Sequence, residues 1–182
     1  MTNSTAPIIT ILKIANCGKL TLPEDPTLTY NIGSHTAEKT LLVRITDNTA
    51  GGLFSSEWIA LSDILITIAK RSENTERFNA KIFTLLYKSQ SVNNAGFLAA
   101  ALKAEGILLP HKASKRLHEM GDATAFENSM QNLIKDKVSL PDVVAERDAA
   151  KAKVQAENVA KLLANRTETA AVKSPAVKLT TK

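Results

Sequence analysis

The spacing of apolar residues changes once along this chain, near residue 50, and no other sequence feature constrains the fold as strongly. Before that point apolar and polar side chains alternate, as at Leu41, Val43 and Ile45. A period of two places successive side chains on opposite faces of a β-strand. In the stretch 58–68 the apolar residues recur every three or four positions, the period of an α-helix. Strands that are followed by helices, rather than interleaved with them, predict an α+β fold.

The first third of the chain is predicted to form a small antiparallel β unit, over residues 1–54. The segments 7–14, 27–32 and 39–46 are rich in Ile, Thr, Leu and Val, which suit a pleated, half-buried surface. The segment LPEDP at 22–26 separates the first two, because its two prolines cannot continue a strand interior. We therefore expect three or four strands joined by short connections.

A helical unit is predicted for residues 55–139, because polar capping residues precede each of its apolar runs. Gly106 is expected to end one of these helices, and Pro110 to open the next, which would run to Gly121. The other predicted helix starts are Ser55 or Ser56, Asn74 or Thr75, the segment 91–94, and Asp122.

Residues 140–166 are predicted to form one long helix, because no Gly or Pro follows Pro141 there and Ala is abundant. Small apolar residues recur every seven positions, a spacing found in coiled coils. Two interpretations stay open: a self-association face over residues 145–163, or a solvated helix held by its intrinsic propensity. Residues 167–182 lack a core-forming pattern and are predicted to be a disordered basic tail. The recurring positions are Ala145, Ala152 and Val159, with Ala149, Ala156 and Leu163 in step.

The segment 93–121 carries the strongest functional signal, since its two predicted helices meet at a Gly-containing corner and the second helix is basic. Helix-turn-helix modules have this outline and grip phosphates with basic side chains. The turn is longer than in tight examples, so a two-helix element with a solvated basic face is the alternative. Lys112, Lys115 and Arg116 would share one helix face. The predicted nucleic-acid-binding residues are Lys103, His111, Lys112, Lys115, Arg116 and His118.

The charge distribution agrees with a polyanion partner for the helical part. The chain has a net charge of +5. Residues 1–60 hold 4 Lys or Arg against 5 Asp or Glu, whereas residues 61–140 hold 11 against 8 and residues 141–182 hold 8 against 5. Positive charge concentrated away from the β unit attracts nucleic acid without specifying its sequence.

No motif in the sequence indicates catalysis, a metal or another cofactor. The three histidines, His35, His111 and His118, are too dispersed to chelate a metal, and neither HExxH nor CxxC occurs. Cys17, the one cysteine, has no base near it in the sequence. We therefore predict a protein that is not an enzyme and has no cofactor.

Two functional hypotheses follow from these patterns. The first is a non-enzymatic accessory or regulatory protein that binds nucleic acid, with DNA favoured over RNA, mainly through phosphates. The second is an adaptor or assembly subunit that docks on a protein partner through its β unit and long helix. No stretch reaches the roughly 20 apolar residues of a membrane span, so no membrane contact is expected. A single cysteine suits the reducing cytoplasm, which is the predicted location.

Overall fold

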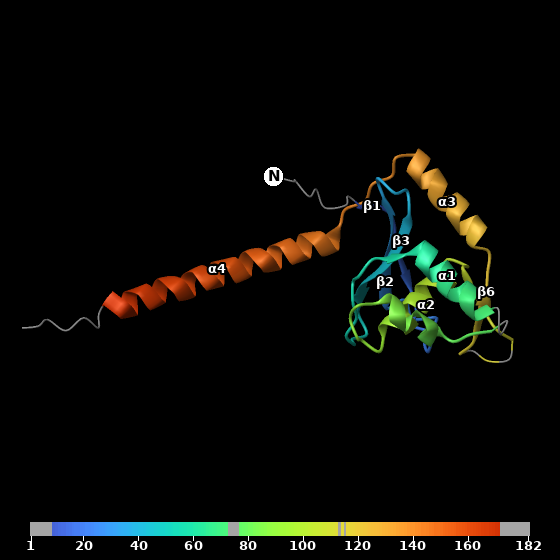
Figure 1. Cartoon of the computed structure of the whole chain (residues 1–182), viewed down its shortest axis with the longest axis horizontal. Helices are drawn as coiled ribbons and strands as arrows, with labels where there is room; N and C mark the ends of the chain where they lie inside the picture. Colours follow the sequence, from blue (N-terminus) through green and yellow to red (C-terminus); the bar gives the residue numbers. More distant parts are fainter. Residues whose placement is uncertain (1–8, 73–76, 113, 115, 172–182) are drawn as a thin grey trace, which may run out of the picture. The chain divides into compact units, whose positions relative to one another are not determined.

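The computed structural model describes residues 9–72, 77–112, 114 and 116–171. The chain divides into two compact units, Met1–Pro141 and Asp142–Lys182. The first holds an antiparallel sheet, several helices and a small hairpin, and the second is formed around one long helix (Figure 1). The predicted α+β class is confirmed, with strands first and helices after them.

The main sheet confirms the predicted antiparallel β unit. Its strands follow one another in space as they do in sequence, and every neighbouring pair is antiparallel. The alternation seen in the sequence is one of residue type. Val43 and Ile45 belong to the apolar core and are each 1% exposed, and Arg44 and Thr46 on the opposite face are also buried. The strands are β1 (Ile9–Cys17), β2 (Leu28–His35), β3 (Leu41–Asn48) and β4 (Ile59–Ala60).

Helices α1 and α2 pack against the sheet, where both contact β3, whereas η1 packs against these two helices and α3 contacts β1 (Figure 1). Leu98 and Ile64 are completely buried in the resulting core. Asp122 caps the third α-helix by accepting a hydrogen bond from the amide of Ala125, as its place in the sequence predicted. The helices are α1 (Leu61–Ser72), the 3-10 helix η1 (Ala80–Leu86), α2 (Asn94–Ala104) and α3 (Ala123–Lys135).

The predicted helix start at Ser55 or Ser56 is wrong. The chain stays extended through β4, which pairs with β3, and α1 begins only at Leu61. Trp58 therefore does not belong to the apolar face of a helix. Its ring lies close to Gly33, where a Cβ would come within 2.8 Å, and the guanidinium carbon of Arg44 is 4.2 Å from the ring centroid. Cation–π contact holds this loop on the sheet.

The predicted helix from Pro110 to Gly121 is also wrong, and with it the helix-turn-helix interpretation of the segment 93–121. Two short strands, β5 (Leu108–Pro110) and β6 (His118–Met120), form an antiparallel hairpin there. Gly106, at a φ of +74°, ends α2 as predicted. Pro110 then favours an extended conformation for Leu109, because its ring clashes with a helical residue before it.

The long helix of the second unit, α4 (Val143–Ala171), confirms the predicted helix and passes its expected end at residue 166. Asp142 caps it by accepting a hydrogen bond from the amide of Ala145 at 2.9 Å. The side chains from residue 145 to residue 161 are all exposed. The predicted tail thus begins inside the helix, and its part from residue 172 on lies outside the described residues.

Candidate nucleic-acid interface

The loop between β5 and β6, residues 111–117, holds most of the residues predicted to bind nucleic acid. The last residue pair of the two strands is Pro110 and His118. Beyond it, the amide of His111 donates a hydrogen bond to the carbonyl of Leu117 at 3.0 Å. Ser114 organises the loop, since its amide donates to the carbonyl of His111 at 3.2 Å and its hydroxyl accepts from the amide of Arg116 at 3.2 Å. The loop is therefore a hydrogen-bonded turn.

Two cationic side chains of this loop are solvent-exposed. Lys112 and Arg116 are both exposed, whereas His111, which directly follows β5, is half-buried. The sequence from Gly106 to His118 contains no Asp or Glu, so no acidic side chain within the loop opposes these charges. Lys115 lies outside the described residues. A short hairpin that carries cations at its tip can contact a polyanion through charge and hydrogen bonds to phosphate oxygens.

His118 has to be removed from the predicted phosphate contacts. Its side chain is buried, at 1% exposure, and its ring centroid lies 6.3 Å from that of Phe78. Neither ring nitrogen has a hydrogen-bond partner among the described residues. Burial lowers the pKa of the imidazole, and the positive charge of Lys103 lowers it further. A neutral, buried ring cannot reach a phosphate, so His118 acts in packing the hairpin.

Lys103 lies apart from the loop, in the last turn of α2. It is half-buried and borders a pocket of about 190 Å³ together with Cys17 and Lys19. Its charge acts on His118, and it belongs to a different element from Lys112 and Arg116. We therefore assign Lys103 at most a long-range contribution to the attraction of polyanions.

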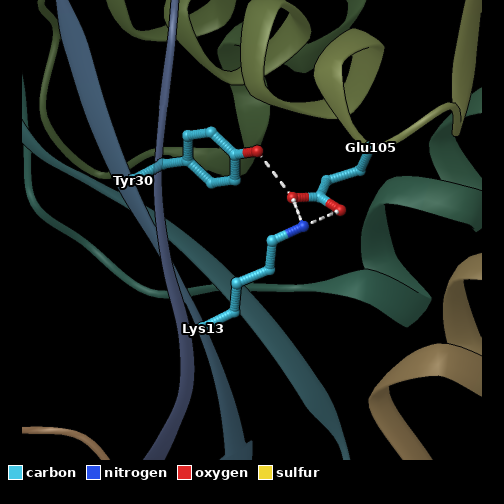
Figure 2. A network of polar contacts seen from close by, with 3 residues as sticks. All are labelled: Lys13, Tyr30 and Glu105. Carbon is cyan, nitrogen blue, oxygen red and sulfur yellow. Dashed lines mark hydrogen bonds and ion pairs between the residues drawn. The ribbon is translucent and has the colours of Figure 1, made fainter.

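A polar network that no sequence motif indicates joins the sheet to the C-terminal end of α2 (Figure 2). The carboxylate of Glu105 accepts a hydrogen bond from the ammonium group of Lys13 at 2.8 Å and another from the hydroxyl of Tyr30 at 2.5 Å. The Glu105 side chain is only 7% exposed. Burial raises the pKa of the Tyr30 hydroxyl, and the hydrogen bond to Glu105 raises it further. The ammonium group of Lys13 and the hydroxyl of Tyr30 both bind the Glu105 carboxylate, which indicates a structural role for all three residues.

Cys17 does not have the properties of a nucleophile. Burial, and to a smaller extent the charge of Glu105, raises the pKa of its thiol to about 11. The thiolate that would react is therefore scarce at neutral pH. In the part of the chain that the structure describes, no three His, Cys, Asp or Glu side chains are grouped to hold a metal. The basic hairpin loop is thus the arrangement with the clearest binding chemistry among the predicted site residues.

Comparisons of this chain with known protein families, with curated proteins and with solved structures gave no match. Across the described ranges, no helix combines the length and the apolar character needed to cross a membrane.

Proposed function

We propose that this protein binds nucleic acid without catalysing a reaction, as an accessory or regulatory factor, and that the β5–β6 loop (residues 111–117) makes the phosphate contacts. The observation that carries the proposal is the loop itself. Lys112 and Arg116 extend into solvent from a hydrogen-bonded turn, and no acidic residue lies within it. Arg and Lys on such a projection suit phosphate oxygens, which accept hydrogen bonds and carry charge.

The order of elements around the loop supports this proposal by analogy. From α1 the chain passes through an isolated bridge at Phe78, then η1, α2 and the hairpin. Phe78 bridges to His118, so β6 lies between Phe78 and β5. Winged helix-turn-helix modules have this order, with a basic hairpin after the last helix. The analogy concerns topology alone and carries no function by itself.

Burial of α2 determines which kind of contact we propose. In a helix-turn-helix module the second helix enters the major groove and reads base edges. In this chain, α2 is the corresponding helix, and most of its residues are buried against the sheet and the other helices. A helix covered in this way cannot enter a groove. We therefore propose binding that is dominated by phosphates and nearly independent of base sequence.

The test is the triple variant Lys112→Ala, Lys115→Ala, Arg116→Ala, titrated against duplex DNA and RNA at two salt concentrations. The affinity should fall at least about tenfold, and the slope of log affinity against log salt should shrink by roughly two to three. All sequences should lose affinity equally, because phosphate contacts do not discriminate between bases. Stability should change by less than about 1 kcal/mol, because the described side chains of this variant, Lys112 and Arg116, are exposed.

A matched control removes the same charge elsewhere: Lys151→Ala, Lys153→Ala and Lys161→Ala, all exposed on α4. This variant should bind nearly as tightly as the unmodified chain. Equal losses in both triple variants would show that net charge matters and the loop does not. Unchanged binding by a folded loop variant would remove the loop from the interface.

The second candidate function, an adaptor or assembly subunit, is favoured by one observation on α4. Every side chain from residue 145 to residue 161 is exposed, and Val154 and Val159 are 56% and 54% exposed. Long helices in proteins are stabilised mainly by packing of an apolar face, which the described side chains of α4 do not show over this range. Light scattering tests self-association: Val159→Glu should dissociate an oligomer. A monomer at high concentration would exclude self-association and leave docking on a different protein as the role of α4.

A further inference from the structure

An open groove in the first unit lies between the β2–β3 turn, the start of β1 and the end of α3. Its volume is about 470 Å³, within the range of small-molecule sites. The apolar lining consists of Ile134 and Val138, both half-buried, and the more deeply buried Leu12. Gln131 and the buried Ser34 are polar lining residues. No residue of the basic hairpin loop (111–117) lines the groove, so the groove is a separate site from the proposed nucleic-acid interface.

Two lysines, Lys39 and Lys137, border this groove from different elements. Lys39 belongs to the β2–β3 turn, where its amide donates to the carbonyl of His35 at 2.8 Å. Lys137 follows α3, where its amide donates to the carbonyl of Ile134 at 3.0 Å. Two cations on one groove create a site of positive potential for an anion between them.

Both lysines have the left-handed backbone conformation that favours glycine, with φ values of 54° at Lys39 and 56° at Lys137. They are the only non-glycine residues with positive φ in the part of the chain that the structure describes. The position after a helix is most often glycine, because a Cβ there is sterically unfavourable. Backbone conformation does not favour lysine at either position. A cation after the C-terminus of α3 interacts favourably with the helix dipole, which accounts for Lys137 only, whereas a shared anionic ligand would account for both lysines.

The remaining lining of the groove has the same chemical preference. The polar side chains are hydroxyls and an amide, and no Asp or Glu is among the described residues that line it. The end of α3 does not oppose an anion strongly, because the carbonyls of Leu133 and Ile134 already accept hydrogen bonds from Val138 and Lys137. The wall thus combines cations, hydroxyl donors and an apolar patch. The hydroxyl-bearing residues are Thr10, Ser34, Thr36 and Ser139.

We propose that this groove binds a small organic anion, whose charged head lies between Lys39 and Lys137 and whose apolar body lies against Leu12 and Ile134. A phosphate or a carboxylate head satisfies this chemistry, because both accept hydrogen bonds from ammonium and hydroxyl groups. Both lysines adopt a left-handed conformation that is unfavourable relative to glycine, and binding of an anion by their side chains would account for lysine at these positions.

The test uses the full-length chain labelled with ¹⁵N and three probes: phenyl phosphate, inorganic phosphate and benzyl alcohol. Phenyl phosphate combines the head and the body, and each of the others supplies one of them. We expect phenyl phosphate to shift the amide signals of Leu12, Ser34 and Val138 saturably, with a dissociation constant of about 1 mM or lower. Inorganic phosphate should compete with it, and benzyl alcohol should bind more weakly than phenyl phosphate.

The decisive variant is Lys39→Gly with Lys137→Gly. Glycine fits both backbone conformations but increases the entropy of the unfolded chain, so the Tm should stay within about 3 °C of the unmodified value. The affinity for phenyl phosphate should fall at least tenfold. The affinity for phenylacetate, a fourth probe that has a carboxylate head, should fall in the same way. The control, Lys39→Arg with Lys137→Arg, keeps both charges and should bind within about threefold of the unmodified chain.

Absence of a saturable shift with either anion would overturn the proposal, and so would equal binding by the double glycine variant. A double glycine variant that binds tenfold more weakly while its Tm is preserved would support it. Neither result depends on whether the chain binds nucleic acid, because the lysines of the groove and of the hairpin loop are different residues.

Discussion

Two alanine-rich helices of this chain, α2 and α4, have opposite environments. In α2 the residues from Phe97 to Leu102 are all buried. In α4 the side chains from residue 145 to residue 161 are all exposed. Alanine favours both helices, because it loses no side-chain entropy on folding. The alanine content therefore explains why both segments are helical and does not explain where either helix lies.

Large apolar residues and polar anchors account for the difference. In α2, Phe97, Leu98 and Leu102 drive burial, and the small alanines between them allow neighbouring elements to approach closely. Both ends of α2 are also fastened: the amide of Ser55 donates to the Asn94 side chain at 2.9 Å, and Glu105 joins the other end to the sheet. In α4 the alanines alternate with charged residues, which keep the helix in water.

The largest effect is expected from removing one core side chain of α2. Leu98→Ala should lower the free energy of unfolding by about 3 kcal/mol, because Leu98 is completely buried and its loss leaves a cavity. The matched change in α4, Val159→Ala, should alter it by less than about 0.5 kcal/mol. Urea unfolding followed by circular dichroism measures both. Similar losses in the two variants would mean that Val159 is packed in solution.

Breaking the polar anchor of α2 should have the next largest effect. Glu105→Ala removes the acceptor of Lys13 and Tyr30, and we expect a loss of about 2 kcal/mol, because a buried hydroxyl and an ammonium group lose their partner. The control Glu157→Ala lies on the exposed surface of α4 and should have almost no effect. Equal stability of the Glu105→Ala variant and the unmodified chain would show that water replaces the carboxylate without cost.

A smaller, pH-dependent effect is expected from Glu57, which fastens the segment before α2. Burial acts to raise the pKa of this carboxyl, but hydrogen bonds from the Lys88 amide, the Ser55 hydroxyl and Ser89 outweigh it and lower the pKa to about 2. A lowered folded-state pKa stabilises the fold above the ordinary value of 4.5, and this stabilisation is lost as the pH falls from 4.5 toward 2.

The expected contribution is about 1 kcal/mol, because solvent screens a partly exposed group. Thermal unfolding of the Glu57→Gln variant should give a shallower decrease of Tm between pH 4.5 and pH 2 than the unmodified chain gives. Parallel pH curves for the two proteins would mean that the Glu57 carboxylate does not hold the segment in solution.

The three long strands of the main sheet were predictable, whereas the two-residue strand β4 and the small hairpin were not, because short strands show no period. Along β3 the apolar core imposes an alternation of residue type long enough to recognise, from Leu41 to Ile45. The strands β5 and β6 have three residues each, too few to show any period. Pro110 was the one local signal of an extended chain there, because it disfavours a helical residue before it.

The candidate sites were predictable only where charge is concentrated in sequence. Lys112 and Arg116 stand out because they are neighbours in a basic stretch. The Glu105 network brings together residues separated by 75 and 92 positions, and no local pattern encodes such contacts. Lys39 and Lys137 have left-handed backbone conformations, for which glycine is the usual sequence signal. Because lysine stands at both positions, neither the two turns nor the groove beside them could be predicted from the sequence.

The smallest effect tests whether alanine acts through propensity alone in α4. Ala152→Gly should lower the helix content measured by circular dichroism and speed amide exchange near residue 152, because glycine is about 1 kcal/mol less favourable in a helix. The global Tm should not move, because the exposed Ala152 contributes no packing. In α2, Ala101→Gly carries the same propensity cost at a residue that is 0% exposed, so the cost should appear in the global free energy of unfolding. A global loss from Ala152→Gly as large as that from Ala101→Gly would show that α4 is packed in solution, and the contrast between the two helices would then be wrong.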